Sequence, residues 1–430
     1  MKLLIISNMS HYLRHDRIVG WGPTVQEIDY LSNIFQEIRH IACLHQGPAP
    51  LSSLPYRSER INLIPVPATG GDDFFDKLGI LRAAPIYLKK ILHEISWADM
   101  IHIRCPANIP LLSIILLTLL PHPKFRWVKF AGNWKPEGDD PWSYAFQRWW
   151  LRKGIHRGIV TVNGRWPDQP SHVYSFLNPC LSLAELKDSA ETHKRKELKF
   201  PLNLLFVGRV ETAKGVGRVL QIAENLAAKG IGINLHIVGD GPERPAFQKF
   251  VENNGLSPQV IFHGWLPKPA LADFYSQAHF FILPSSASEG WPKVVSEAMA
   301  YGAVPLAGAV SSIPQILAAS GAGKALPPLD IDAFVEAILA YIKQPECWQE
   351  ASQAGMAAAP RFTYEYYLQA LRQTFQAAWG ITLPKIRETM TQPGIQAPHN
   401  NHYDHSQELI VIDKEICRGV KGRPGFSGER

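Results

Sequence analysis

The sequence has few cysteines, and their arrangement excludes a disulfide framework. Their number is odd, they are scattered along the chain, and no CxxC pair occurs. The five are Cys43, Cys105, Cys180, Cys347 and Cys417. This pattern is typical of reduced thiols in a cytosolic protein, so we expect a cytoplasmic location.

Long hydrophobic runs are also missing, which argues against a membrane-spanning protein. The most apolar run, IPLLSIILLTLLP at residues 109–121, is shorter than the roughly 20 apolar residues that a transmembrane helix needs. We expect it to form a buried helix. The stretch MKLLIISNMS at the N-terminus is not followed by a small-residue cleavage site, so we interpret it as a first strand rather than a signal peptide.

The charge is nearly balanced, and no dinucleotide-binding fingerprint is present. A formal net charge of +6 is small for 430 residues, so the charge does not imply a nucleic-acid partner. The glycine-containing stretches VGDGP at 238–242 and KGVGR at 214–218 lack the GxGxxG spacing, which argues against a nicotinamide-dependent dehydrogenase. With 46% hydrophobic and 19% charged residues, the composition is that of an ordinary globular protein.

Patterns that would hold a metal ion are weak. GDD occurs at 71–73 and at 138–140, in each case in an expected loop of the N-terminal half. The stretch HNNHYDH at 399–405 contains metal-ligand residue types, but it sits in a polar tail without a scaffold. We therefore expect no metal requirement and no cofactor.

Strand-like apolar runs alternate with helical patterns along most of the chain, which predicts parallel sheets covered on both faces. The alternation covers residues 1–185, is interrupted by a charged stretch at 186–200, and restarts over 201–360. We therefore expect an α/β protein with two Rossmann-like domains that face each other across a cleft, joined by a linker at 186–200. Residues 361–383 form an aromatic helical pattern, and the polar residues 384–430 are expected to have little fixed structure.

An anion site is predicted where the first strand of the second domain ends. In FVGRVETAKGVGRVL, at 206–220, Arg209 and Lys214 follow the strand and a helix begins near Gly215. An arginine fork, a lysine charge and a helix N-terminus together favour a phosphate group. The same residues are also consistent with ordinary surface charges at a βα turn.

Two glutamates mark a second junction in the same domain. In SEGWPKVVSEAMAYG, at 288–302, Glu289 precedes a helix and Glu297 lies inside it. The backbone N–H groups near Gly290 and Lys293 would face the crevice at the strand ends, where a diphosphate fits. A carboxylate accepts two hydroxyl hydrogen bonds, which suits a ribose diol or a sugar. A capping carboxylate and a solvated helix glutamate would produce the same spacing.

Together these motifs resemble the nucleotide-binding half of retaining GT-B-fold glycosyltransferases of family 4 (glycosyl transferases group 1). The order of G-R-x4-K and a later E-x7-E is matched by Gly208, Arg209 and Lys214, then by Glu289 and Glu297. HGW at 263–265 and PKVVSEAMAYGAVPLAGAVSSIPQIL at 292–317 also fit the usual order.

The resemblance implies a role for each matched residue. Arg209 and Lys214 would hold the donor diphosphate, Glu289 the transferred sugar and Glu297 the ribose. Arg209, Lys214 and Glu289 are then the expected catalytic residues. The last helix would cross back to the first domain. Members often have glycine two residues after an aromatic position, whereas here Pro292 and Lys293 follow Trp291. The Lys293 side chain would either add charge near the leaving diphosphate or face solvent.

The resemblance is weaker in the N-terminal half, where it still suggests substrate contacts. Gly20 and Gly22 would belong to a glycine-containing loop that approaches the donor phosphates. In HIRCPAN, Arg104 replaces an expected second histidine; it cannot act as a general base, but it would suit a phosphate or an anionic acceptor. His102 would pack within its strand.

The loop KFAGNWKPEGDDPW, at 129–142, is expected at the entrance for the acceptor. We predict an acceptor contact for Asn133, and two alternatives are open for Trp134: stacking on a sugar ring, or burial as part of a structural loop. From residue 123 to 165 there are nine Lys and Arg against three Asp and Glu, interleaved with aromatic residues. This face would suit anionic lipid headgroups, and it would equally suit solvent.

The resulting interpretation is a retaining glycosyltransferase. It would transfer a sugar from a UDP- or GDP-sugar to a glycan or lipid-linked saccharide in surface polysaccharide biosynthesis, in the cytoplasm or at the inner face of the membrane. Two alternatives remain open: a GT-B-fold sugar-nucleotide epimerase, and a non-catalytic sugar-nucleotide-binding protein, which the replacement at Arg104 motivates.

Overall fold

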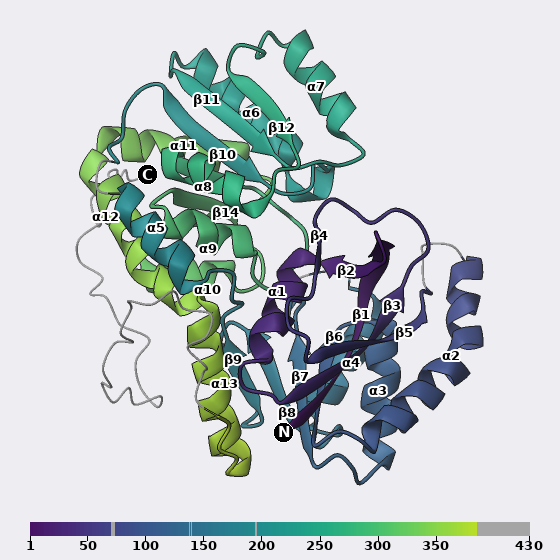
Figure 1. The fold of residues 1–430 in the computed structure, drawn as a ribbon. Coiled ribbons are helices and arrows are strands. Elements are labelled where there is room, and N and C mark those ends of the chain that lie inside the picture. The colour runs from purple at the N-terminus through teal and green to yellow at the C-terminus, as the bar shows by residue number, and fades with distance from the viewer. Residues whose placement is uncertain (70–73, 137, 139, 194–195, 385–430) are drawn as a thin grey trace, which may run out of the picture.

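The computed structural model describes residues 1–69, 74–136, 138, 140–193 and 196–384, which form two α/β domains stacked end to end (Figure 1). The elements of the first domain are β1 (Lys2–Arg14), β2 (Arg17–Trp21), α1 (Gly22–Leu31), β3 (Glu37–Leu44), β4 (Ser53–Pro55), β5 (Ile61–Pro67), α2 (Phe74–Ile95), β6 (Met100–Cys105), α3 (Asn108–Leu119), β7 (Phe125–Phe130), α4 (Trp142–Arg152), β8 (Ile159–Asn163) and β9 (Val173–Phe176).

The first domain is built on a nine-stranded sheet whose core strands are parallel. The order is β4-β2-β1-β6-β7-β8-β9, and β3 pairs with β1 and β5. The strands β3, β6, β7 and β8 and the first part of β1, residues 2–7, are parallel and mostly buried, as expected for a sheet covered on both faces. One face packs on α2, α3 and α4, and the other packs on α1.

The start of this domain departs from the expected short first strand. Strand β1 continues to Arg14, turns at His15 and Asp16, and returns as β2, which pairs antiparallel with both β1 and β4. Both turn residues have positive φ, 47° and 59°, the conformation of a tight two-residue hairpin turn. We refer to this three-stranded antiparallel unit, β1 from Ser10 onward with β2 and β4, as the hairpin extension.

The second domain contains a six-stranded parallel sheet in the order β12-β11-β10-β13-β14-β15. Its elements are α5 (Leu183–His193), β10 (Leu202–Val207), the 3₁₀ turn η1 (Thr212–Lys214), α6 (Val216–Ala228), β11 (Ile233–Val238), α7 (Arg244–Asn253), β12 (Val260–Gly264), α8 (Lys268–Gln277), β13 (Phe280–Leu283), α9 (Lys293–Ala300), β14 (Val304–Gly308), α10 (Ile313–Ser320), β15 (Lys324–Leu326), α11 (Ile331–Lys343), α12 (Pro345–Ala358) and the 3₁₀ turn η2 (Ala359–Phe362).

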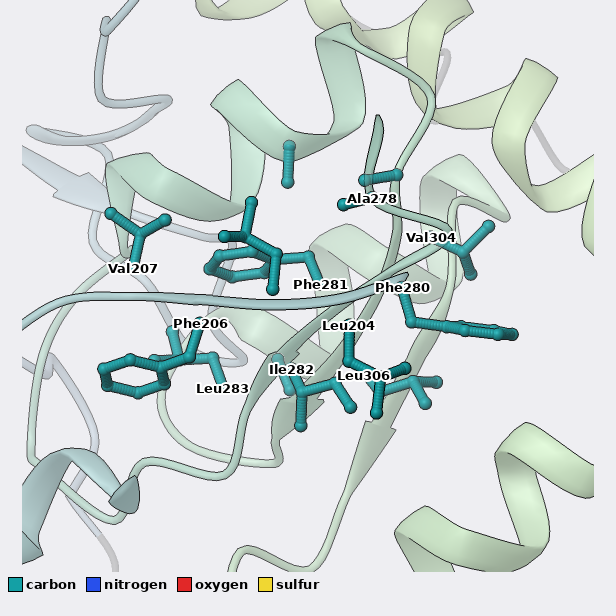
Figure 2. Packing of buried hydrophobic residues seen from close by; sticks show 14 of the residues in the cluster. Leu204, Phe206, Val207, Ala278, Phe280, Phe281, Ile282, Leu283, Val304 and Leu306 are labelled. Atoms are coloured by element: carbon teal, nitrogen blue, oxygen red, sulfur yellow. The ribbon is translucent and has the colours of Figure 1, made fainter. Parts of the chain in front are cut away.

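The core of the second domain is continuous through its central strands. Figure 2 shows the side chains of Leu204, Phe206, Phe280, Phe281 and Leu306 packed together on β10, β13 and β14. Every residue of β13 is buried, which explains why this run is uniformly apolar rather than alternating.

The stretch expected to be a linker begins as a helix. Helix α5 occupies residues 183–193, and a capping box starts it: the backbone N–H of Ser182 donates to Glu185 Oε2 at 2.7 Å, and the N–H of Glu185 donates back to Ser182 Oγ at 3.2 Å. Leu186 packs on the core of the second domain. A short apolar contact and a cap are sufficient for a helix here, although the charged sequence lacks a long apolar stripe.

The last described helix, α13 (Tyr364–Trp379), returns to the first domain as expected (Figure 1). Its residues Leu368, Leu371 and Phe375 pack in the same cluster as Ile28 of α1 and Trp127 of β7. Thr363 caps the helix by accepting a hydrogen bond from the N–H of Tyr366 at 3.2 Å, and Gly380 ends it with φ of 69°. No helix among the described residues has both the length and the apolar character needed to cross a bilayer.

Candidate functional site

The two predicted βα junctions of the second domain meet at one ion pair. Strands β10 and β13 are neighbours, so the loops that follow them leave the same edge of the sheet. Lys214, at the end of η1, forms an ion pair with Glu289, in the loop before α9. Lys214 is mostly covered and Glu289 is partly exposed. The structure therefore brings together one predicted phosphate ligand and the predicted sugar ligand.

The turn that positions Lys214 depends on the next residue, Gly215. Gly215 has φ of 88°, and an added Cβ would lie 2.4 Å from the carbonyl oxygen of Pro284. Helix α6 can start against β13 only because this residue has no side chain. Arg209, the other predicted phosphate ligand, lies earlier in the same loop. Its side chain is 70% exposed and pairs with Glu211 at 3.3 Å, so the arginine is not held against Glu289.

Glu297, the second predicted glutamate, is more deeply buried than Glu289. It is on α9, accepts a hydrogen bond from Tyr275 Oη at 2.9 Å, and lies 3.9 Å from Lys268 Nζ. Burial raises the pKa of Glu297 above its ordinary value, and Lys268 opposes this shift. The carboxylate predicted to bind ribose is thus supported by a tyrosine and a lysine that the sequence analysis did not identify.

The loop around Gly290 is also where the two domains touch. The backbone of Glu289 forms an antiparallel bridge with Gly132, which lies in the loop after β7. A Cβ on Gly290 would lie 2.5 Å from both the Ala131 carbonyl oxygen and Asn163 Nδ2. The predicted contribution of Gly290 to a diphosphate site is therefore accompanied by a structural role: the residue permits close contact between the domains.

Lys293 neither faces solvent nor lies free beside Glu289. Its Nζ donates to the carbonyl oxygen of Pro23 at 3.0 Å and lies 3.7 Å from Glu27 Oε2, both on α1 of the other domain. Of the two alternatives open for Lys293, the solvent-facing one is wrong, because the first turn of α9 points toward α1. Burial lowers the pKa of Lys293 below that of an ordinary lysine, and Glu27 opposes the shift.

Glu27 is the centre of a buried ion cluster at this junction. Its carboxylate lies 2.7 Å from both Arg104 Nη1 and Lys129 Nζ, and Tyr367 Oη donates to it at 3.4 Å. Burial alone would raise the pKa of Glu27, but Arg104, Lys129 and Lys293 together hold it well below the ordinary value. We refer to Glu27, Arg104, Lys129 and Lys293 as the Glu27 cluster.

The cluster changes the interpretation of Arg104. This arginine was expected to contact a phosphate or an anionic acceptor, and in the structure its guanidinium pairs with the carboxylate of Glu27.

His102, two residues earlier, is fully buried and stacks on Trp127 with ring centroids 3.6 Å apart, so the expectation of a packed histidine is correct. Burial lowers the pKa of Lys129 to about 7, although Glu27 raises it.

The sequence contained a signal for Glu27 and Lys129. Glu27 lies in the helix run VQEIDYL beside the buried residues Val25 and Ile28, and Lys129 interrupts the apolar strand FRWVKF. A charged residue on an apolar face requires a buried partner. The pairing itself was not visible, because the two residues are 102 positions apart.

Gly20 and Gly22 are not in a loop. Gly20 lies in β2, where an added Cβ would meet Met9 and His11 at 2.6 and 2.7 Å, and Gly22 is the first residue of α1. The N–H of Gly22 donates to the Ser52 carbonyl oxygen at 3.0 Å, so it is already used. The expectation of a loop at these glycines is wrong, because β1 continues to Arg14 and returns as β2, whereas their contact with the donor phosphates stays a prediction.

The acceptor loop is folded inward at its start. Asn133 is buried and its Oδ1 accepts a hydrogen bond from the N–H of Lys135 at 3.1 Å. Trp134 is buried and packs edge-on against Phe130, with centroids 5.3 Å apart. Of the two alternatives for Trp134, the structure has the buried one.

Within the residues that the structure describes, no group of three or more His, Cys, Asp or Glu side chains is arranged to hold a metal ion. The stretches 71–73 and 399–405 and part of 138–140 lie outside the described residues.

The chain is similar to known glycosyltransferases over its second domain. Residues 189–358 match the family model described as Glycosyl transferases group 1. An alpha-D-kanosaminyltransferase from Streptomyces kanamyceticus is 26% identical over 196 residues, which is 44% of this chain and 50% of that protein. A lipopolysaccharide 1,6-galactosyltransferase from Salmonella typhimurium is 31% identical over 137 residues, covering 31% and 38% of the two chains. The chain thus matches half or less of the length of these two relatives.

Solved structures extend the likeness to both domains. Sucrose-phosphate synthase from Thermosynechococcus elongatus superposes with a TM-score of 0.63 at 16% identity, covering 88% of this chain and 99% of that one. Anabaena HepE, crystallised in complex with UDP, gives a TM-score of 0.61 at 14% identity, with 88% and 100% covered. At these identities the likeness shows the fold. With two facing α/β domains and a returning last helix, the chain has the GT-B fold, and residues 189–358 of its second domain match the glycosyl transferases group 1 model.

Proposed function

We propose that this protein is a retaining glycosyltransferase that uses a UDP- or GDP-sugar as donor, without a metal or cofactor. The observation that carries the proposal is the Lys214–Glu289 ion pair, formed by side chains from two separate βα junctions. Both lie in the segment that matches the group 1 family model. A cation and a carboxylate side by side at the ends of parallel strands suit a ligand that is both phosphorylated and hydroxylated.

In this proposal a bound donor replaces the internal pairing. The diphosphate pairs with the charge of Lys214, and Arg209, which is exposed and pairs with Glu211, turns toward it. Glu289 is then free to accept hydrogen bonds from the hydroxyls of the sugar. Two cations on the diphosphate stabilise it as a leaving group, and the departing phosphate accepts the proton of the acceptor. No protein base is needed, which is consistent with an arginine at position 104.

Glu297 is assigned to the ribose. Its contact with Tyr275 Oη at 2.9 Å fixes the carboxylate, and Lys268 keeps a positive charge nearby. Backbone N–H groups in the first turn of α9, which begins at Lys293, lie between Glu289 and Glu297 in sequence and would face the diphosphate.

The acceptor is proposed to be a glycan or a lipid-linked saccharide of surface polysaccharide synthesis, in the cytoplasm or at the inner face of the membrane. The lipopolysaccharide galactosyltransferase among the relatives supports this class. Aromatic and basic residues on α4 support contact with anionic lipid: Trp142 is 78% exposed, and Arg152 and Lys153 are exposed at the other end of the helix. Arg148 does not contribute, because it is buried and pairs with Asp140 at 2.7 Å.

Nucleotide binding tests the donor site first. Thermal unfolding of the wild type is measured with UDP, GDP and ADP, because a ligand of the native state raises the midpoint. We expect a rise with UDP or GDP that is lost in Lys214→Ala and retained in Lys229→Ala, an exposed lysine after α6. No shift with any of the three would refute the donor assignment.

Product analysis separates the proposal from its two alternatives. The protein is incubated with the donor that binds, and the products are followed by NMR with and without a lipid-linked saccharide. Transfer with the anomeric configuration of the donor retained is the expected result. Conversion of the donor sugar without an acceptor would indicate the epimerase, and binding without any turnover would indicate the non-catalytic protein.

A further inference from the structure

Trp21 lies at the domain junction with its indole uncovered. It is the last residue of β2 and the N-cap of α1, two residues before Pro23, whose carbonyl oxygen accepts the hydrogen bond from Lys293. The residue is 54% exposed. Within the described part of the chain, the indole has no hydrogen-bond partner and no ring contact.

The backbone around Trp21 is held firmly. Trp21 pairs with Ser53 across the β2–β4 ladder, and the adjacent N–H of Gly22 donates to Ser52 at 3.0 Å. Arg14, in β1, donates hydrogen bonds to the carbonyl oxygens of Pro50 and Ser53 at 2.6 and 3.2 Å, so the residues around β4 are fixed to the rest of the hairpin extension. An exposed aromatic ring on a fixed backbone loses little freedom when a ligand covers it.

The helix start next to Trp21 in the chain offers backbone hydrogen-bond donors. Helix α1 starts without a side-chain cap, so its first turn has backbone N–H groups with no capping side chain from Trp21. The Glu27 cluster lies one to two turns further along the same helix. A flat apolar face beside hydrogen-bond donors matches a saccharide ring, which presents C–H groups on one face and hydroxyls at its edge.

We infer that Trp21 is a platform on which the acceptor saccharide stacks. The inference rests on the proposed glycosyltransferase function and names the acceptor side of that same site. The role that the sequence suggested for Trp134 is thereby transferred to another tryptophan, since Trp134 is buried. The proposed donor residues Lys214 and Glu289 belong to the second domain, whereas Trp21 belongs to the first, and the inference assigns the platform to the saccharide and not to the nucleotide.

The test uses the full chain, measured without nucleotide and in the presence of UDP, GDP or ADP, and methyl glycosides of glucose, galactose, mannose and N-acetylglucosamine as probes. Binding is followed by saturation-transfer NMR. We expect Trp21→Ala to weaken binding of the best probe by about tenfold, the loss of about 1.4 kcal/mol of stacking energy. Trp21→Phe, which keeps an aromatic face, should retain most of the binding.

A matched control is available on the opposite face of the sheet. Trp149 on α4 is 49% exposed, so Trp149→Ala removes a similar area far from α1, and we expect unchanged binding. In protein labelled with 5-fluorotryptophan, the resonance that disappears in Trp21→Phe should shift when the probe is added. This readout reports on Trp21 directly and does not depend on turnover.

The outcomes separate the two proposals. Equal probe binding by the wild type and Trp21→Ala, or no binding of any of the probes by the wild type, would overturn the platform. Weaker nucleotide binding in Trp21→Ala would also overturn it, since the ring would then contact the donor. If the nucleotides fail to bind while probe binding still depends on Trp21, the platform stands and the donor assignment fails.

Discussion

The backbone of Glu289 pairs with the backbone of Gly132 across the two domains. The residue proposed to hold the donor sugar is thus joined directly to the loop that begins the acceptor side. Movement of one domain relative to the other must displace Glu289 or break this bridge. We therefore expect the geometry of sugar binding and the closure of the domains to change together.

Replacement of Gly290 by alanine should separate the domains at this point. The new Cβ would lie 2.5 Å from the Ala131 carbonyl oxygen, which is backbone and cannot rotate away. We expect a loss of about 1–3 kcal/mol in unfolding free energy and a larger radius of gyration in solution scattering. Gly79→Ala on α2, where no atom lies within 4 Å, is the control and should not expand the protein. An unchanged radius in Gly290→Ala would show that the contact tolerates a side chain.

Glu27→Gln should be strongly destabilising. The substitution leaves Arg104, Lys129 and Lys293 without their carboxylate in a buried site, and loss of one partner from a buried ion pair costs about 3–5 kcal/mol. Urea unfolding followed by tryptophan fluorescence measures the effect. Glu37→Gln removes a partly exposed carboxylate 3.5 Å from Arg39 and should cost less than about 1 kcal/mol. Equal costs for the two variants would contradict the assignment of Glu27 as the centre of the cluster.

Lys293→Met should loosen the contact between α9 and α1 while keeping the length of the side chain. The variant loses the hydrogen bond to Pro23 and the charge facing Glu27. We expect faster limited proteolysis between the domains. Lys324→Met in β15, an exposed lysine over the Tyr341 ring, provides the comparison and should be cleaved at the wild-type rate. Because burial lowers the pKa of Lys293, alkaline pH should weaken the contact of the wild type earlier than an ordinary lysine would.

Acid should destabilise the protein through His11. This side chain is fully buried, with Nε2 3.0 Å from Tyr56 Oη, and burial lowers the pKa of His11 to about 4. Between the unfolded pKa near 6.5 and the folded value, the unfolded chain binds more protons, so stability falls as the pH falls. The contribution of His11 to the free energy of unfolding therefore decreases by about 2 kcal/mol between pH 7 and pH 5.

Urea titrations at the two pH values check this dependence. His11→Gln should reduce the dependence by this amount and leave the part due to other buried histidines, whose pKa values burial also lowers. His93→Gln, at an exposed histidine on α2, should leave it as in the wild type. A slope that is the same in His11→Gln and the wild type would exclude His11 as its source.

Much of the proposed donor site could be predicted from the sequence, because its parts are close together in the chain. The strand, the glycine turn and Lys214 lie within 13 residues, and Glu289 and Glu297 flank one helix start. Their meeting follows from two parallel strands that are neighbours in the sheet. The likeness to family members reinforced this assignment, since their motif order is retained here.

The acceptor side was less predictable, because long-range packing determines it. Nothing in NMSHYLRHD marks a hairpin: the turn residues His15 and Asp16 adopt positive φ without a glycine, so β1 was expected to end early. The Glu27 cluster joins three elements that are far apart in sequence. Lys293 was misjudged for the same reason, because its partner belongs to the other domain.

The two segments that connect the domains are hydrogen-bonded to each other. The N–H of Cys180 donates to Phe362 O and the N–H of Tyr364 donates to Leu181 O, each at 2.9 Å, immediately before α13 returns to the first domain. The first domain is therefore formed by two separate parts of the chain, the N-terminal residues and α13. During synthesis its core is complete only after residues near 375 have left the ribosome. A chimera that exchanges the first domain between relatives must therefore exchange both the N-terminal residues and α13. A single crossover would leave α13 packed against a first domain from another protein.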